Sequence, residues 1–142
     1  MSYYIDTNIF VYSALAHPVY GKPCKHIIDD IQNQKIKAYC SFLVATELLG
    51  SLAKIDKERA PVALNAFFSL PTKMLQIDEQ VLLDAAEITR QSGVRYDSIH
   101  AACMRRNSLD TVITEDVTDW SKIKNFQIIR PLEYEKTAKI QR

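Results

Sequence analysis

Five short runs rich in apolar and β-branched residues alternate with longer stretches of helical spacing, and this alternation is the strongest constraint on the fold. The runs lie at residues 3–5, 36–40, 74–77, 111–114 and 126–129. Strands that are joined by helical crossovers pair in parallel and carry helices on both faces of the sheet. The sequence therefore predicts an α/β fold of three layers, with a doubly wound parallel sheet.

The helices between these runs carry recognisable ends and apolar stripes. Asp78 and Gly93 are placed to cap a helix over residues 80–92, while Pro61 and Pro71 bracket another helix. We expect two buried stripes, Ala45/Leu48/Leu49/Leu52 and Val81/Leu82/Ala85/Ile88, and core positions for Tyr3, Tyr4, Phe67 and Phe68. The first stripe leaves Glu47 at the rim of its helix, together with Leu43, Val44 and Ser51.

Length and composition place the chain among ordinary globular proteins. Its 142 residues, 47% of them hydrophobic and 25% charged, predict one domain over residues 1–142. Three scattered cysteines, Cys24, Cys40 and Cys103, predict neither a zinc site nor disulfides, so we expect a reducing compartment, the cytoplasm. The N-terminus lacks a basic signal region and no apolar run approaches 18 residues, so we expect neither export nor membrane insertion. With only three glycines there is no phosphate-binding loop, so no nucleotide cofactor is expected.

The net charge of +1 makes no case for nucleic acid, but the C-terminal segment is basic. From Ser121 onward there are six basic residues and two acidic ones, a local balance of +4. The basic residues are Lys122, Lys124, Arg130, Lys136, Lys139 and Arg142. Both a phosphate-facing tail and a solvated charged terminus are compatible with this pattern.

Acidic residues follow two of the predicted strands directly. Asp6 ends the first strand, and Asp116 follows the fourth, with Asp119 one turn later. Ligands of open parallel sheets bind beyond the carboxyl ends of the strands, so these side chains are expected in one crevice. Asp97 opens the helix that precedes the fourth strand, and Glu47 is the rim residue described above.

Carboxylates gathered in one place repel one another and raise each other's pKa unless a cation compensates. Oxygen ligands without a histidine or cysteine cluster suit Mg²⁺ or Mn²⁺. Such ions activate water and neutralise the charge that develops on a phosphodiester, which is hydrolytic nuclease chemistry.

Each acid also has an ordinary structural explanation. Asp6 and Asp97 are suited to capping helices, Asp116 and Asp119 to loop turns, and Glu47 to a solvated helix face. His100, one turn after Asp97, is a candidate general acid or phosphate contact, or else a packing histidine. Arginines flanking the site are further candidate phosphate contacts, namely Arg95, Arg105 and Arg106.

Four ordered motifs resemble the PIN domain family, and within it the small VapC-type toxins. They are YIDTNIF, ATELLG, RYDSIHAAC and VITEDVTDW, and the resemblance covers essentially the whole chain. It implies a twisted five-stranded parallel sheet of order 3-2-1-4-5. It also implies that Asp6, Glu47, Asp97 and Asp116 are acidic metal ligands, with Asn8 and Thr114 as polar support.

The fifth acid departs from the family pattern. Many members carry Asp-x-Asp-Phe, whereas this chain has one residue more between Asp116 and Asp119, which puts the ligand role of Asp119 in doubt. The resemblance further implies a metal-dependent endoribonuclease that acts on RNA, a homodimer, and a VapB-like antitoxin whose tail occupies the acidic crevice.

Three other functions compete with the nuclease. A phosphatase of the haloacid dehalogenase type requires a second Asp where this chain has Asn8, and a receiver domain requires paired acids near the N-terminus, where only Asp6 stands. The third is a PIN-like scaffold that binds RNA or protein without cutting. Such a scaffold has no use for four mutually repelling acids.

Overall fold

A single parallel sheet of five strands forms the centre of the molecule. The structure, a computed structural model, describes the backbone of residues 1–141 and the side chains of residues 1–138. The strands run in the order β3-β2-β1-β4-β5, and every neighbouring pair is parallel. Their bounds are β1 Ser2–Ile5, β2 Lys37–Ser41, β3 Lys73–Leu75, β4 Thr111–Ile113 and β5 Gln127–Ile129. The predicted strands and the predicted order 3-2-1-4-5 are confirmed, with strand ends shifted by at most two residues.

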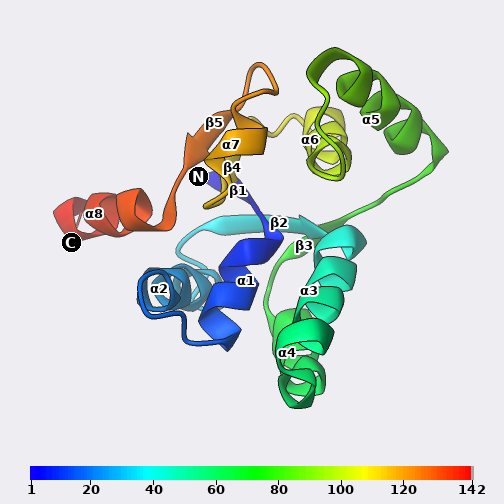
Figure 1. Ribbon diagram of the computed structural model, residues 1–142. Coiled ribbons are helices and arrows are strands. Elements are labelled where there is room, and N and C mark those ends of the chain that lie inside the picture. Colours follow the sequence, from blue (N-terminus) through cyan, green and yellow to red (C-terminus); the bar gives the residue numbers. More distant parts are fainter. Residues whose placement is uncertain (142) are drawn as a thin grey trace.

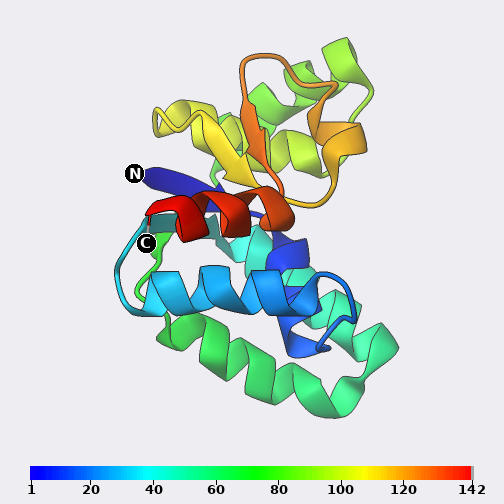
Figure 2. The same cartoon turned by 90° about the vertical axis from the view of Figure 1, so that its left-hand side faces the viewer.

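Helices cover both faces of the sheet, which completes the predicted three layers (Figures 1 and 2). One side carries α1 Thr7–Ala14, α2 Gly21–Gln32, α3 Phe42–Ile55 and α4 Ala60–Ser69, with a 3₁₀ turn at Lys57–Arg59. The other side carries α5 Glu79–Ser92 and α6 Asp97–Arg106. The short α7 Val117–Trp120 follows β4, and α8 Pro131–Gln141 packs against α2 (Figure 2).

Burial on both faces explains why the central strands read as continuous apolar runs rather than alternating ones. Tyr4 and Ile5 of β1, like Val112 and Ile113 of β4, are fully buried. A strand in the middle of a three-layer fold has no solvent-facing side, so every position favours an apolar or hydrogen-bonded residue. The sheet is therefore a rigid platform for whatever follows the carboxyl ends of β1 and β4.

Local sequence signals place the helix ends as predicted. The Asp78 carboxylate accepts a hydrogen bond from the Val81 backbone N–H, and α5 ends at Gly93 in the left-handed conformation, with φ of 75°. Pro61 stands in the first turn of α4, where its missing N–H costs nothing. These signals fix where α4 and α5 begin and where α5 ends.

Three residues predicted to be in the core are instead exposed. Leu49, Leu82 and Phe68 have exposed fractions of 45%, 49% and 52%, whereas Val44, predicted at the rim, is fully buried. Helical periodicity gives the spacing of an apolar stripe but not the direction in which its centre faces. That direction depends on packing, here on the contacts between α3 and α4 and between α5 and α6.

Two findings bear on the predicted environment of the protein. Among the described residues, no helix combines the length and the apolar character needed to cross a membrane. Cys24, Cys40 and Cys103 are all buried free thiols.

Candidate metal centre

The carboxyl ends of β1 and β4 lie side by side and begin the site. Ile5 pairs with Ile113 in the sheet, and the backbone N–H of Asp6 donates to the Ile113 carbonyl over 3.1 Å. Asp6 and Thr114 therefore follow adjacent strands at the same edge. This is the crevice that the sequence predicts for the strand-end acids.

Asp6 is the most enclosed acid of the site, with an exposed fraction of 4%. Its Oδ2 accepts hydrogen bonds from Thr114 Oγ1 at 2.7 Å, Trp120 Nε1 at 3.0 Å and Asn8 Nδ2 at 3.4 Å. Among the residues that the structure describes, its Oδ1 accepts a hydrogen bond from the Thr7 backbone N–H alone, at 2.8 Å, so Asp6 also caps α1. The two explanations offered for Asp6 are thus compatible, because capping leaves one lone pair of Oδ1 for a ligand.

Asn8 and Thr114 connect Asp6 to the loop after β4. Asn8 Nδ2 donates to Thr114 Oγ1 over 3.0 Å, and its Oδ1 accepts the Glu115 N–H at 3.1 Å. Thr114 Oγ1 in turn accepts the Asp116 N–H at 3.0 Å. Both residues therefore hold the β4 loop in place, in the supporting positions that the resemblance implies.

Glu47 projects from α3 toward the same crevice and is tied down by two donors. Its Oε1 accepts hydrogen bonds from His100 Nε2 at 2.6 Å and from Thr7 Oγ1 at 2.8 Å. Burial by itself would raise the pKa of Glu47, but the bonds from His100 and Thr7 outweigh it and hold the pKa below its ordinary value. Glu47 is therefore a carboxylate at neutral pH.

Asp97, Asp116 and Asp119 form a second group, in which each side chain offers one oxygen within 4.8 Å of the others. Burial, followed by the charge of Asp6 and then that of Asp116, raises the pKa of Asp97 to about 8. His100 acts in the opposite direction but does not compensate. This group is short of positive charge, which is the condition that a bound divalent cation would relieve.

The additional residue before Asp119 is accommodated by α7. Asp116 caps this short helix, and its carboxylate accepts the Asp119 N–H at 3.4 Å. The turn brings Asp119 back beside Asp97 and Asp116, although Asp119 also lies 3.7 Å from Lys122 Nζ. With the longer spacing, Asp119 thus stays within the acidic group and is paired with Lys122.

His100 is fully buried, and its location is a correction to its proposed role as a phosphate contact. Both ring nitrogens are engaged inside the protein, Nδ1 with Tyr4 and Nε2 with Glu47. Burial lowers the pKa of the imidazole, but Glu47 and the nearby Asp6 and Asp97 raise it above its usual value. His100 is therefore a buried, hydrogen-bonded packing histidine and not a surface contact for phosphate.

The arginines lie at different distances from the acids. Arg95 is exposed and stands two residues before Asp97. Arg105 lies at the other end of α6, about 12 Å along the helix axis from Asp97. It donates to the Lys124 carbonyl at 3.1 Å and lies over the Phe126 ring, 5.3 Å from its centroid. Arg106 pairs with Asp84 on α5. Arg105 is therefore not beside Asp97 itself, and its side chain lies against Lys124 and Phe126.

Two cations of the basic C-terminal segment also lie near the acids. Arg130 pairs with Glu115, and Lys122 reaches Asp119, so these two cations stand beside the loop after β4. The side chains of Lys139 and Arg142 lie outside the described residues.

Three residues of the site carried no recognisable signal in the sequence: Tyr4, Thr7 and Trp120. Tyr4 and Trp120 look like ordinary core residues, and Thr7 like a helix-starting residue, because their hydrogen bonds go to partners far along the chain. One clue exists for Trp120. It stands where the family pattern carries Phe, and only the indole offers an N–H.

The donor set fits a hard divalent cation. The acids supply carboxylate oxygens on one edge of the sheet, Asp97 is destabilised as a carboxylate, and the fixed hydrogen bonds leave oxygens of Asp6 and Glu47 free. The side chains that could hold such an ion fall into two groups, in each of which the ligand atoms lie within 4.8 Å of one another, Asp6 with Glu47 and His100, and Asp97 with Asp116 and Asp119.

Comparison with known proteins identifies the family. Residues 3–125 match the sequence profile of the PIN domain. The chain belongs to the PIN domain family. The matched range spans the four motifs on which the resemblance rests, so the predicted family is confirmed. A search of curated proteins found no match.

Solved structures share the fold of this PIN domain at low sequence identity. A chain of VapBC2 from Rickettsia felis, solved with a DNA fragment of its promoter, is 20% identical, with a TM-score of 0.69. The similarity covers 92% of this chain and 98% of that one. VapC20 of Mycobacterium tuberculosis, described as a sarcin-ricin loop cleaving toxin, is 17% identical with a TM-score of 0.70, covering 85% and 94%. VapBC-1 from nontypeable Haemophilus influenzae is 20% identical with a TM-score of 0.66, covering 93% and 99%.

Replacing Trp120 with Phe tests the indole hydrogen bond. Trp120→Phe keeps an aromatic ring but removes the donor to Asp6 Oδ2, and hydrogen bonds to charged groups contribute about 1.5–3 kcal/mol. We expect the free energy of urea unfolding to fall by about 2 kcal/mol. Phe126→Leu is a matched control, because Phe126 packs edge-on against Trp120 without touching Asp6. Equal stability of Trp120→Phe and wild type would show that this bond contributes nothing.

Proposed function

We propose that this PIN domain acts as a single-domain endoribonuclease that hydrolyses RNA phosphodiester bonds with Mg²⁺ or Mn²⁺, and that it is the toxin of a VapBC-type pair. The observation that carries the proposal is the Asp97, Asp116 and Asp119 group beside Asp6, where burial and charge leave Asp97 with a pKa of about 8. A site of this kind needs a cation, and its place at the carboxyl edge of a parallel sheet is open to a substrate.

The side chains of the site have two proposed roles, to hold the cation and to orient the residues that hold it. Asp6, Asp97 and Asp116 would hold the cation, with Glu47 and Asp119 as further carboxylates. When bound, a divalent ion supplies an activated water and neutralises the charge that builds on the phosphodiester. Thr114, Trp120 and Asn8 orient Asp6 by binding its Oδ2. The two donors on Glu47 Oε1 leave its Oε2 to accept a hydrogen bond from water.

A basic pocket next to the acids supports a polyanionic substrate. It has a volume of about 290 Å³ and is lined by Arg105, Lys122 and Lys124, with Ile88, Gln91, Ser92 and Ile123 completing the wall. Lys122 joins the pocket to the acidic group, because its ammonium lies 3.7 Å from Asp119. A strand whose scissile phosphate sits at the acids therefore has cations for a neighbouring phosphate.

Neutralising this pocket is expected to weaken RNA binding rather than chemistry. The double variant Lys122→Gln/Lys124→Gln removes two candidate phosphate contacts, so the slope of log K against log salt should shrink by about 1.4 for single-stranded RNA. The measurement is fluorescence anisotropy of a labelled RNA in EDTA between 50 and 200 mM salt. Lys22→Gln/Lys35→Gln, two exposed lysines on and just after α2, is the charge-matched control. An unchanged slope in the pocket variant would exclude these contacts.

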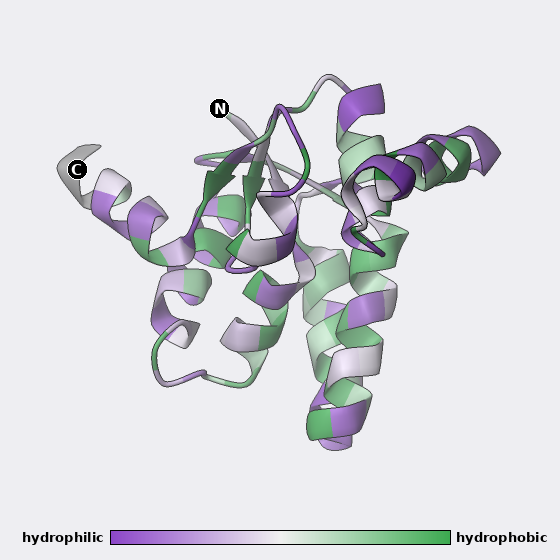
Figure 3. Ribbon diagram, turned by 45° about the horizontal axis from the view of Figure 1, so that its top comes forward, coloured by the Kyte–Doolittle hydropathy of each residue, from purple (hydrophilic) through white to green (hydrophobic). Residues whose placement is uncertain are grey.

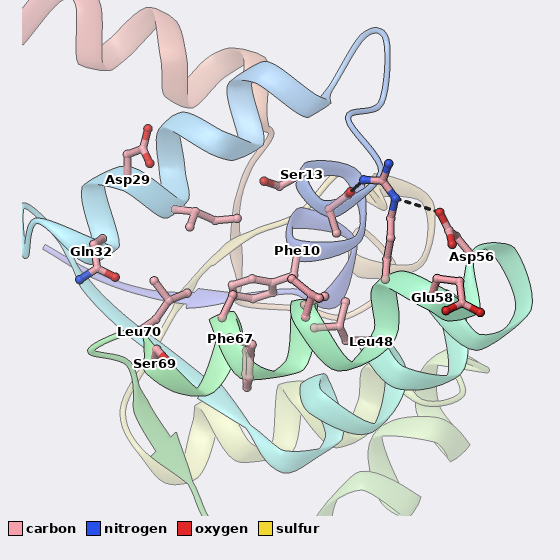
Figure 4. A pocket seen from close by; sticks show the side chains of 16 residues that line it. Phe10, Ser13, Asp29, Gln32, Leu48, Asp56, Glu58, Phe67, Ser69 and Leu70 are labelled. Atoms are coloured by element: carbon pink, nitrogen blue, oxygen red, sulfur yellow. Dashed lines mark hydrogen bonds and ion pairs between the residues drawn. The ribbon is translucent and has the colours of Figure 1, made fainter.

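A second groove is the proposed binding site of the antitoxin. It has a volume of about 700 Å³ between α1, α2 and α4, with an apolar floor that includes Phe10, Leu48 and Phe67 (Figure 4). Asp29 and Glu58 stand at its margins, and Arg59 is held by Asp56 and the Ala14 carbonyl. An apolar floor with acidic margins fits an amphipathic helix flanked by basic residues. Several structural neighbours are complexes of a VapC with a VapB, which favours a VapB-like chain as its occupant.

We propose that an exposed apolar face of α3 and α4 binds a second copy of the chain. Phe42 and Phe68 are both largely exposed, and their rings lie 5.9 Å apart across α3 and α4. Figure 3 shows hydrophobic colour along these two helices. Leu49 extends the patch, and exposed apolar patches of this kind often mark protein interfaces. Light scattering of the purified chain measures the copy number directly.

The working compartment that we propose is the cytoplasm. The three thiols are free and buried. Burial, and to a smaller extent the charge of Glu115, raises the pKa of Cys24 to about 12. Such thiols suit a reducing environment.

The proposed activity is tested with a mixed pool of structured RNAs. The pure protein is incubated with Mg²⁺, with Mn²⁺ and with EDTA, and cuts are mapped by sequencing. Cleavage that needs metal supports the nuclease. Absence of cleavage under every condition, together with no carboxylate-dependent metal uptake in calorimetry, would instead favour the RNA- or protein-binding scaffold.

A further inference from the structure

A chain of four polar side chains runs from the interior of the protein to Glu47. Ser41 Oγ and Tyr4 Oη lie 2.9 Å apart, Tyr4 Oη and His100 Nδ1 lie 2.5 Å apart, and His100 Nε2 lies 2.6 Å from Glu47 Oε1. Ser41, Tyr4 and His100 are all fully buried. The four residues belong to β2, β1, α6 and α3, so the chain crosses the sheet and joins both helical layers.

The direction of each hydrogen bond follows from the last member. A carboxylate only accepts, so His100 Nε2 must carry the hydrogen that reaches Glu47. In the neutral ring Nδ1 is then an acceptor, which the Tyr4 hydroxyl satisfies, and the Ser41 hydroxyl donates to Tyr4. In the charged ring Nδ1 donates to Tyr4, and Tyr4 donates to Ser41. The bond to Glu47 is the same in both states, so the arrangement does not depend on the charge of the ring.

Packing holds the ring in this orientation. The imidazole lies against the Tyr4 ring with centroids 5.3 Å apart and leaves no polar atom exposed. Its Nε2 also lies 3.9 Å from Asp6 Oδ1, between the two carboxylates. A ring held from behind by Tyr4 and in front by Glu47 has no second orientation that satisfies both nitrogens.

Glu47 is the member that most needs such support. Its side chain has three rotatable bonds, comes from a helix rather than a strand end, and is 30% exposed. His100 and Thr7 both bind Oε1 and therefore leave Oε2 as the oxygen presented to the crevice. Outer partners that orient a ligating side chain commonly change metal affinity or activity by 10–100-fold when they are removed.

We propose that His100 is a positioning residue, and that the buried Ser41–Tyr4–His100 chain selects the Glu47 oxygen that faces a bound divalent cation. The inference rests on the proposed metal-dependent function of the same acids. It assigns the histidine neither to the substrate nor to the metal itself. Tyr4, two residues before Asp6 and outside the crevice, becomes part of the metal site through this chain.

The test measures Mn²⁺ affinity by calorimetry, independently of cleavage. Tyr4→Phe keeps the ring and removes only the hydroxyl, and we expect it to weaken Mn²⁺ binding about tenfold. His100→Leu should weaken it by up to about 100-fold, while His100→Gln, whose amide retains an N–H donor, should recover part of that loss. Tyr39→Phe is the matched control, because Tyr39 lies on β2 under Lys73 and takes no part in the chain.

A second measurement separates positioning from stability. Nitrogen chemical shifts of the His100 ring should show an Nε2–H, and Tyr4→Phe should move the Nδ1 shift. Wild-type Mn²⁺ affinity in folded Tyr4→Phe and His100→Leu would overturn the inference, as would a wild-type protein that binds no metal. A third outcome is that wild type binds Mn²⁺, the Tyr4 and His100 variants bind it more weakly, and no RNA is cut. That outcome would contradict the proposed nuclease function and leave His100 as a positioning residue.

Discussion

Asp97→Asn is expected to abolish metal-dependent RNA cleavage, with a fall in rate of more than about 100-fold, beyond the loss typical of outer-shell changes. Asp97 stands at the first position of α6, and the charges of Asp6 and Asp116 both act on it. The amide keeps the size of the side chain but removes the charge that a divalent cation needs. The measurement is the cleavage rate of a labelled RNA at saturating Mg²⁺, and then at saturating Mn²⁺.

Asp110→Asn is the matched control for this variant. Asp110 is exposed and precedes β4, at the opposite end of the strand from the crevice, so the same change of charge occurs away from the acids. Its cleavage rate should equal that of wild type. If Asp97→Asn cuts RNA as fast as Asp110→Asn, the acidic group is not the reaction centre.

The same substitution is expected to stabilise the protein when no metal is present. The pKa of Asp97 is about 8 in the folded chain and about 3.9 in an unfolded one. Between these values the unfolded state releases the proton and the folded state keeps it, so the free energy of unfolding falls as pH rises from about 4 to about 8. Asparagine has no such proton. Asp97→Asn should therefore exceed wild type by an amount on the order of a few kcal/mol at pH 8, and by little at pH 4.

Urea unfolding in EDTA at pH 4, 6 and 8 measures this difference. Adding Mg²⁺ at pH 8 should raise the stability of wild type, because a ligand that binds only the folded state stabilises it, and should leave Asp97→Asn unchanged. A variant less stable than wild type at pH 8 in EDTA would contradict the raised pKa. A gain in stability coupled to a loss of cleavage is expected where function requires mutually repelling groups.

The sequence was informative wherever a residue's neighbours along the chain decide its environment. The five strands, the caps at Asp78 and Gly93, and the acids after β1 and β4 all depend on such local patterns. The exposure of Leu49 and Phe68 does not follow from local pattern. The sequence gives the period of an apolar helical stripe, but packing against other elements decides which way the stripe faces.

By itself, the sequence determined the α/β class, the order of motifs that belongs to PIN domains, and the set of acids at one edge of the sheet. Tertiary structure decided how those acids are held. Asp6 is oriented by Trp120 from 114 positions away, and Glu47 by a histidine 53 positions away that is itself anchored on Tyr4. Such hydrogen bonds have no periodicity along the chain and arise only when β1, α3, α6 and α7 meet. The physical reason is that strand-end positions follow from local pattern, whereas the partner of a buried polar atom is chosen by the packing of distant segments.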